Sequence, residues 1–346
     1  MLRKKHVPIS VIFELTLGCN MRCIHCGSAA GNVRSKELTT KEWIDLSKKL
    51  NEIGTQLVAF SGGEPLIRND WFEIGQNVRD LGMDLSIISN GYVIDEKMVS
   101  QFRKLDPYSV AISLDGAVAS THDSVRQVNG SFEKCLKVLK LLKENDLPTT
   151  VVTTIHKKNV GELPKLRDML LDKGIAWQIQ IAIPVGRFPK NLTLTKEEFY
   201  SASMFISQSK NKYSKKRLPV MGAHSIGYNP KFIRNPMLVP RWKGCQAGIS
   251  ALGIQSDGGV IGCLSLPDDF VEDNIRSRDI KEIWNDSEMF SFNRKFTLDD
   301  LDGDCKECKF GKSCKGGCTT VSATLTGEMH CDPYCLYLIE KEMTIK

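Results

Sequence analysis

The stretch SVIFELTLGCNMRCIHCG at residues 10–27 joins an apolar run to three closely spaced cysteines. The run at 10–15 has the β-branched and aromatic composition of a buried strand. The cysteines that follow have polar neighbours, which argues against a buried apolar helix face. Thiolates in a tight loop converge well on a metal. We therefore predict a metal or iron–sulfur site immediately after the first strand, at Cys19, Cys23 and Cys26.

The number of cysteines in this loop separates two kinds of metal site. Three thiolates leave one iron of a 4Fe-4S cluster free for a ligand that is not protein. A structural zinc ion would need a fourth protein ligand, and His25 is the candidate close by. Both interpretations stay open on spacing alone.

The first 184 residues alternate strand-like and helix-like segments. Apolar strands are predicted at 10–15, 56–61, 84–89, 109–113, 149–154 and 177–183. Amphipathic helices are predicted at 39–53, 71–81, 95–105, 132–145 and 161–173, the first opening with the capping box of Thr39 and Glu42. This alternation indicates parallel strands joined by right-handed crossovers. We expect an α/β fold, either doubly wound or a partial (β/α)6 barrel.

The cysteine loop resembles that of the radical S-adenosylmethionine (SAM) superfamily, whose CxxxCxxC motif lies at the mouth of a partial TIM barrel. The resemblance implies a [4Fe-4S] cluster that binds SAM and reductively cleaves it. This yields methionine and a 5′-deoxyadenosyl radical, which abstracts hydrogen from a substrate carbon. His25 stands where the family often has an aromatic residue.

Further motifs extend the resemblance to the SAM-binding residues. Ser61-Gly62-Gly63-Glu64-Pro65 follows the second strand, where the family's GGE motif binds the methionine amino group. A glycine pair lets backbone carbonyls approach an ammonium closely. Ser113 and Arg126 resemble the pair of residues that holds the methionine carboxylate in the family. Asn90 and Gln180 are weaker candidates for the site.

The C-terminal cysteines resemble the SPASM module of radical SAM peptide maturases. The resemblance implies two auxiliary [4Fe-4S] clusters. Cluster I would be held by Cys245, Cys263 and Cys318, and cluster II by Cys305, Cys308, Cys314 and Cys335. Cluster I lacks a fourth cysteine, so either one iron is open or Cys331 or a carboxylate fills the position. Cys331 is alternatively a cluster ligand, a thiol hydrogen donor or a buried cysteine, and Cys135 is interpreted as a small buried hydrophobe.

We divide the chain into a barrel at 1–184, a basic connector at 185–244 and an auxiliary-cluster domain at 245–346. The chain of 346 residues has a formal charge of +6, and the connector holds twelve Lys and Arg against two Glu. A basic connector beside the barrel mouth would attract an acidic leader peptide. Nucleic acid is not expected as a partner, because few aromatic residues are interleaved with the basic ones and the acidic residues at 245–346 would repel phosphate.

The resemblance implies a peptide or protein substrate, modified by crosslinking, thioether formation, oxidation or epimerisation. The alternatives are side-chain modification of a tetrapyrrole in haem-type biosynthesis and a non-enzymatic iron–sulfur or zinc-binding protein. We expect an external electron donor such as flavodoxin or ferredoxin, and precursor recognition either by the barrel and connector or by a separate protein. The cluster motifs imply a reducing, oxygen-poor cytoplasm. Membrane insertion and secretion are not expected, because Pro8 and Glu14 interrupt the apolar N-terminal run.

Overall fold

A single ten-stranded sheet forms the framework in a computed structural model, which describes residues 6–237 and 242–345. The order is β10-β9-β8-β1-β2-β3-β4-β5-β6-β7, and every pairing from β8 through β1 to β7 is parallel. The six predicted strands appear as β1 Ser10–Thr16, β2 Leu57–Gly62, β3 Asp84–Ser89, β4 Ser109–Ser113, β5 Thr149–Ile155 and β6 Ala176–Ile181.

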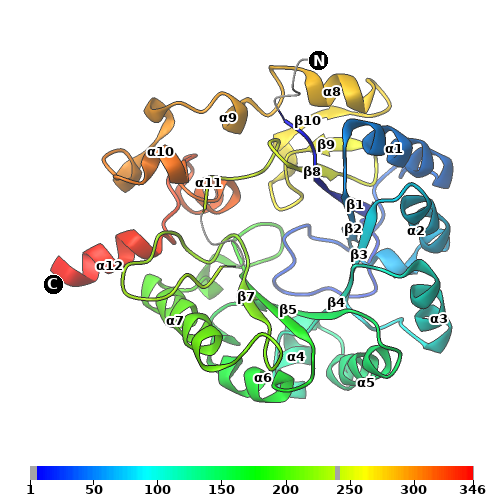
Figure 1. Cartoon of the computed structure of the whole chain (residues 1–346), viewed down its shortest axis with the longest axis horizontal. Helices are drawn as coiled ribbons and strands as arrows, with labels where there is room; N and C mark the ends of the chain where they lie inside the picture. The colour runs from blue at the N-terminus through cyan, green and yellow to red at the C-terminus, as the bar shows by residue number, and fades with distance from the viewer. Residues whose placement is uncertain (1–5, 238–241, 346) are drawn as a thin grey trace.

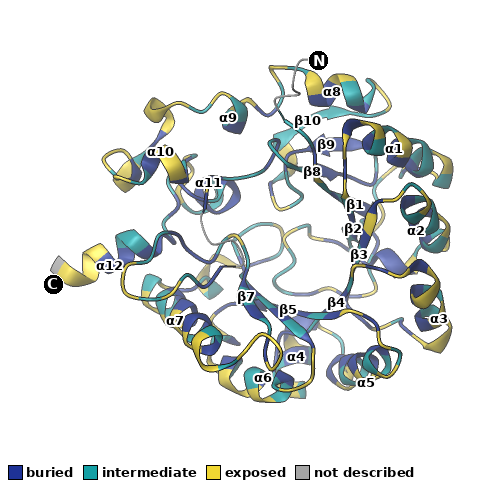
Figure 2. Cartoon of the chain, viewed as in Figure 1, coloured by how far each residue is buried: buried dark blue, intermediate teal, exposed yellow. Residues whose placement is uncertain are grey.

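The strands curve into a partial barrel with helices on its outer side (Figure 1). Alternate side chains such as Phe13, Phe60 and Trp177 are fully buried against these helices, as the pleat of a strand requires. Figure 2 shows the same division, with each helix buried on its sheet side and exposed outside. The helices are α1 Thr40–Ile53, α2 Trp71–Asp80, α3 Glu96–Leu105, α4 Ala119–Arg126, α5 Ser131–Glu144, α6 Leu163–Leu170 and α7 Lys196–Lys212.

Local sequence signals explain where these helices begin. The side chain of Thr39 accepts a hydrogen bond from the Glu42 backbone, and Glu42 reaches back to the Thr39 backbone, so the predicted capping box is confirmed. Thr195 and Glu198 form a second box at the start of α7. Among the described residues, no helix is long and apolar enough to cross a membrane.

The segment expected to be a connector belongs in part to the barrel. It provides α7 and the strand β7 (Val220–Gly222), which pairs in parallel with β6. The connector interpretation is wrong for these elements, because Val220 continues the sheet rather than linking two bodies. Helix α4 was also not predicted, since its sequence ASTHDSVR offers few apolar positions.

The C-terminal region extends the other edge of the sheet and then returns to α7. Strand β8 (Ala251–Ile254) pairs with β1, followed by β9 (Gly259–Ile261) and β10 (Val271–Asn274). Beyond them lie short helices, and the stacked rings of Phe199 and Tyr334 join this region to α7. These elements therefore span the side that the parallel strands leave open (Figure 1). The helices are α8 Ile280–Asn285, α9 Ser291–Arg294, α10 Gly311–Cys314, α11 Thr319–Thr326 and α12 Leu336–Ile345.

The basic cluster at residues 210–217 lies at the opposite end of the barrel from the cysteine loop. It immediately precedes β7, and Arg217 pairs with Asp172, which precedes β6. The cysteine loop, in contrast, follows the carboxyl end of β1. We expected the basic connector to lie beside the barrel mouth that carries the cysteine loop. For the basic residues 210–217 this expectation is wrong. Lys210 also does not project freely, because its ammonium donates to three backbone carbonyls.

Candidate cofactor site and cysteine clusters

The cysteine loop is positioned at the carboxyl ends of the strands, where α/β barrels place their active sites. Cys23 is buried, and Cys19 and Cys26 are partly buried. The backbone N–H of Met21 donates to the Cys19 sulfur at 3.4 Å, and that of Ala30 donates to the Cys26 sulfur at 3.4 Å. Such bonds favour thiolates and tune an iron–sulfur cluster.

Neighbouring strand ends hold this loop in place. Asn90, after β3, donates from its side-chain amide to the Asn20 side-chain oxygen at 2.7 Å. The same nitrogen lies 4.0 Å from the Cys19 sulfur. On the other side, the Ile24 N–H donates to the Val125 carbonyl of α4 at 2.9 Å. The structure thus brings Asn90, a weak candidate from sequence, into contact with the cysteine loop.

The glycine pair after β2 packs directly against the start of the cysteine loop. The N–H of Gly63 donates to the Thr16 carbonyl, and that of Glu64 donates to the Gly18 carbonyl. A Cβ atom on Gly63 would lie 2.1 Å from the Gly18 oxygen, which no side chain tolerates. The close approach of two backbones therefore explains the glycine at this position.

Glu64 is fully buried and receives three hydrogen bonds. Ser89 Oγ and the Leu66 N–H donate to one carboxyl oxygen, and the Asn90 N–H donates to the other. Burial raises the pKa of Glu64 to about 7, whereas these donors favour the ionised form. An ammonium ligand nearby would favour ionisation further.

We expect Glu64→Gln to lower the free energy of unfolding of the cluster-free protein by about 1–3 kcal/mol. In wild type the carboxylate accepts hydrogen bonds from buried N–H and hydroxyl donors. The amide nitrogen of glutamine is itself a donor, so it could not accept from the group that it faces. Urea denaturation under reducing conditions measures the change. The exposed Glu73→Gln on α2 is the matched control and should stay within about 0.5 kcal/mol of wild type. Equal stability of Glu64→Gln and wild type would contradict this role.

Arg126 is buried beside the cysteine loop, with its Nη1 3.7 Å from the Cys23 sulfur. Its Nη2 lies 2.5 Å from the carboxylate of Asp115, and its buried Nε has no hydrogen-bond partner among the described residues. The unpartnered donor is compatible with an acceptor on a bound ligand. Within residues 6–237 and 242–345, no hydrogen bond or ion pair joins Arg126 to Ser113, so their shared carboxylate role stays a prediction.

Asp115 follows β4 and was not among the site residues predicted from sequence. Its carboxylate faces Arg126, His25 at 3.4 Å and the Thr154 N–H at 2.8 Å. Burial alone would raise the pKa of Asp115, but the Arg126 guanidinium and nearby histidines hold it below its ordinary value. Burial lowers the pKa of His25 to about 4, which favours the neutral imidazole. An acidic residue directly after a strand was the available signal.

Two other residues from the sequence prediction lie in the barrel wall. Gln180 on β6 donates to the Thr154 hydroxyl of β5 at 3.0 Å, so this hydrogen bond lies within the sheet and not at the cysteine loop. Cys135 on α5 is fully buried, with its sulfur near the carbonyls of Asn90 and Ser113. Burial raises the pKa of Cys135 to about 12, which agrees with an inert packing residue.

The C-terminal cysteines form two neighbouring groups. Burial raises the pKa of Cys318 well above its ordinary value, and the thiols of Cys245 and Cys263 act in the same direction. In the second group, burial raises the pKa of Cys305 to about 12, with Cys331, Cys335 and Cys308 as neighbours. Burial also raises the pKa of Cys314, and the thiols of Cys335 and Cys305 act in the same direction. These neighbours are compatible with the ligand sets expected for clusters I and II, and the assignment of each ligand stays a prediction.

Cys331 lies beside the loop that carries Cys305. The chain fold places its sulfur against the loop of cluster II, where a Cβ atom on Gly303 would lie 2.7 Å away. Burial raises the pKa of Cys331, and the carboxylates of Asp302, Asp304 and Asp332 act in the same direction. This position is nearer to the ligands expected for cluster II, and the role of Cys331 stays a prediction.

The donor sets consist of cysteines, the ligands that iron–sulfur clusters use. No three His, Cys, Asp or Glu side chains of the described residues come close enough to share one ion. A 4Fe-4S cluster does not require this, because each thiolate binds a different iron. The unpartnered Arg126 Nε and the sulfur-directed N–H groups are compatible with a cluster and an organic ligand in the first site.

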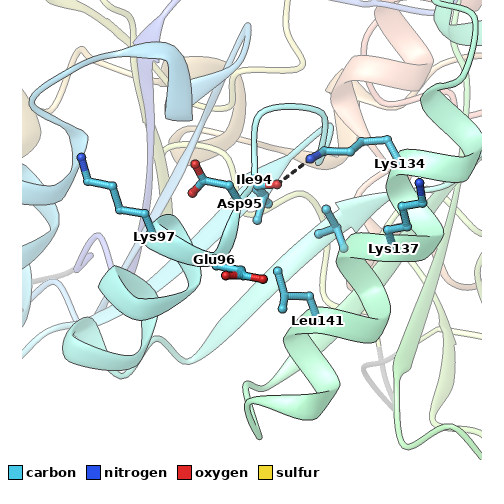
Figure 3. Close-up of a pocket in the computed structure, with 8 residues that line it drawn as sticks. Ile94, Asp95, Glu96, Lys97, Lys134, Lys137 and Leu141 are labelled. Carbon is cyan, nitrogen blue, oxygen red and sulfur yellow. Dashed lines mark hydrogen bonds between the residues drawn. The ribbon is translucent and has the colours of Figure 1, made fainter.

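A shallow pocket of the structure lies apart from this site. Figure 3 shows it between α3 and α5, where the Lys134 ammonium donates to the Ile94 carbonyl at 2.8 Å. None of the site residues predicted from sequence lines it. It therefore adds nothing to the cofactor site.

Comparison with known families and proteins agrees with both cysteine motifs. The family model described as the radical SAM superfamily matches residues 13–170, and the SPASM model, an iron–sulfur cluster-binding domain, matches residues 245–309. An AdoMet-dependent heme synthase from Methanosarcina barkeri is 29% identical over 350 residues, covering 97% of this chain and 99% of the relative. A PqqA peptide cyclase from Bradyrhizobium diazoefficiens is also 29% identical, over 95% of this chain and 86% of the relative.

Among solved structures, the fold is similar to that of SuiB from Streptococcus suis bound to S-adenosylmethionine. The TM-score is 0.75 at 17% sequence identity, and the match covers 91% of this chain and 74% of that protein. At this identity the likeness concerns the fold. It agrees with the predicted combination of a partial barrel and a C-terminal cysteine-rich domain.

Proposed function

This chain is a radical SAM enzyme with a C-terminal SPASM domain, and from that premise we propose that it abstracts hydrogen from a side chain of a peptide or protein. The radical SAM domain binds a [4Fe-4S] cluster and SAM, and the SPASM domain binds auxiliary iron–sulfur clusters. When bound and reduced, the first cluster supplies the electron that cleaves SAM to methionine and the 5′-deoxyadenosyl radical.

The chain's own residues would hold and orient the cofactor. Cys19, Cys23 and Cys26 would bind the cluster and leave one iron for SAM. The backbone carbonyls at Gly62 and Gly63 would accept from the methionine ammonium, with Glu64 adding negative charge. Ser113 and Arg126 would receive the carboxylate, for which the unpartnered Arg126 Nε supplies a buried donor. Asn90 would support this site through the cysteine loop.

The inner face of the barrel is the observation that carries the substrate class. Residues alternating with the buried outer positions are mostly only partly buried, so this face is accessible. It is rich in hydroxyl and amide side chains, and none of the strands β1–β6 contains a Lys or Arg. Such a lining suits the neutral hydrogen-bonding groups of a peptide. The polar members include Ser10, Ser61, Ser86, Ser109, Ser113, Thr150, Thr154, Gln178, Gln180 and the buried Glu14, which pairs with Arg34.

A tetrapyrrole substrate is the second candidate. The similarity to a relative named AdoMet-dependent heme synthase, over 97% of this chain, favours it. The similarity to a relative named PqqA peptide cyclase favours a peptide at the same identity. The carboxylates of a tetrapyrrole would require cations, which the strands β1–β6 lack. This physical difference leads us to place the peptide first.

The auxiliary clusters and partners complete the proposal. Cys245, Cys263 and Cys318 would leave one iron of cluster I open, since Cys331 lies with the cluster II residues. That iron would accept a substrate group or another ligand. Flavodoxin or ferredoxin would supply electrons, and a separate protein would assist precursor recognition. Because the strands β1–β6 carry no Lys or Arg, recognition of an acidic leader would fall to surfaces outside the strands.

Formation of 5′-deoxyadenosine tests the substrate class directly. We expect short precursor peptides encoded beside the gene to stimulate its formation several-fold, with a mass change in the peptide. Iron-coproporphyrin III is the matched tetrapyrrole probe and should produce neither stimulation nor a modified product. Stimulation by the porphyrin with loss of a side-chain group would replace the peptide proposal with the tetrapyrrole one.

A further inference from the structure

The loop that follows β6 reaches across the barrel mouth to the cysteine loop. Strands β1 and β6 are separated by four other strands in the sheet, so this contact does not arise from strand pairing. Gly186 lies so close to the cysteine loop that a Cβ atom on it would be 2.2 Å from the Gly27 oxygen. Its φ of +62° also favours glycine.

Arg187, the next residue, donates three hydrogen bonds to backbone carbonyls of the cysteine loop. Its N–H donates to Cys26 at 3.0 Å, its Nε to Cys23 at 3.1 Å and its Nη1 to Ala30 at 2.6 Å. The side chain is partly buried, and the acceptors include two of the three predicted cluster ligands. Arg187 thus spans the loop rather than projecting from the surface.

We propose that Arg187 is a positioning residue that fixes the cysteine loop in the conformation required to hold the radical cluster. A guanidinium presents several N–H donors in a rigid plane, so one side chain can bond carbonyls on both sides of the loop. Lysine keeps the charge but cannot reproduce that planar arrangement. From sequence, Arg187 is one of the basic residues of the connector. Its place shortly after the predicted strand at 177–183 is the feature that could have indicated a position at the barrel mouth.

Removal of the side chain leaves the Cys23 and Ala30 carbonyls without these donors. Both residues are buried, so loss of the bonds is expected to loosen the loop. The effect should be local, because the remaining loop contacts to Asn20 and Ile24 come from other elements. We therefore expect the radical cluster to be affected while the auxiliary clusters stay bound.

Iron analysis of anaerobically reconstituted protein tests this inference. We expect wild type to hold about twelve irons and Arg187→Ala to lose about four of them. In the Cys19→Ala, Cys23→Ala, Cys26→Ala background, adding Arg187→Ala should cause no further loss. Arg187→Lys should retain an intermediate amount, and the exposed Lys190→Ala is the matched control with wild-type iron.

Hydrogen–deuterium exchange of the cluster-free protein provides a readout independent of iron and activity. Amides at 19–30 should exchange faster in Arg187→Ala, with the wild-type rate at 305–335. Wild-type iron together with unchanged exchange would overturn the proposal. An equal loss of iron on adding Arg187→Ala to the Cys19→Ala, Cys23→Ala, Cys26→Ala variant would also overturn the proposal. In that case Arg187 would support the whole fold.

The inference rests on the proposed ligand role of Cys19, Cys23 and Cys26, and the two can fail separately. If the triple alanine variant keeps all its iron, the ligand assignment is wrong. If that variant loses iron but Arg187→Ala does not, the ligand assignment stands and only the role of Arg187 is wrong.

Discussion

Replacing Cys19, Cys23 and Cys26 by alanine should abolish the formation of 5′-deoxyadenosine from SAM. These thiols lie in the loop after β1, and N–H donors are directed at the Cys19 and Cys26 sulfurs. Without thiolates the cluster has no protein ligands, so the electron cannot be delivered to SAM. The variant should also lose about four of about twelve irons, which leaves the auxiliary clusters in place.

The measurement is product formation by anaerobically reconstituted protein with SAM and a chemical reductant. Cys135→Ala is the matched control, because this buried thiol lies on α5 and is not a predicted ligand. It should retain both cleavage and iron content. Undiminished cleavage by the triple variant would refute the assignment of the radical cluster.

Gly63→Ala should reduce 5′-deoxyadenosine formation on the order of 100-fold. Its Cβ would lie 2.1 Å from the Gly18 carbonyl oxygen and 2.6 Å from that of Leu17. Both are backbone atoms, so the start of the cysteine loop or the end of β2 must move. Displacing either would misplace the cluster ligands relative to the methionine-binding backbone.

Initial rates and SAM affinity should be measured together for this variant. Gly161→Ala is the matched control, since a Cβ there meets nothing within 4 Å and the residue is exposed. It should behave as wild type. A Gly63→Ala enzyme with normal turnover and iron content would show that the close backbone approach is not required.

Much of the barrel could be predicted because its information is local. Each predicted strand from 10–15 to 177–183 overlaps an observed one, since apolar runs with outer-face burial read directly as strands. The box at Thr39 and Glu42 likewise marks the start of α1 within a few residues. Helix α4 was not predicted because its turns are polar. Its burial depends on a tertiary contact, the ion pair between its last residue, Arg126, and Asp115.

The cysteine spacings predicted a radical SAM loop and a SPASM domain through their resemblance to known families, because ligand spacing is a property of the chain. Three features depended on the tertiary structure. Strand direction placed residues 210–217 opposite the cysteine loop, and packing grouped Cys331 with Cys305. Closure of the mouth brought Arg187 to carbonyls 157 and 164 positions earlier in the chain. Such contacts depend on how distant strand ends face one another in the closed sheet, and no local pattern of residues encodes that geometry.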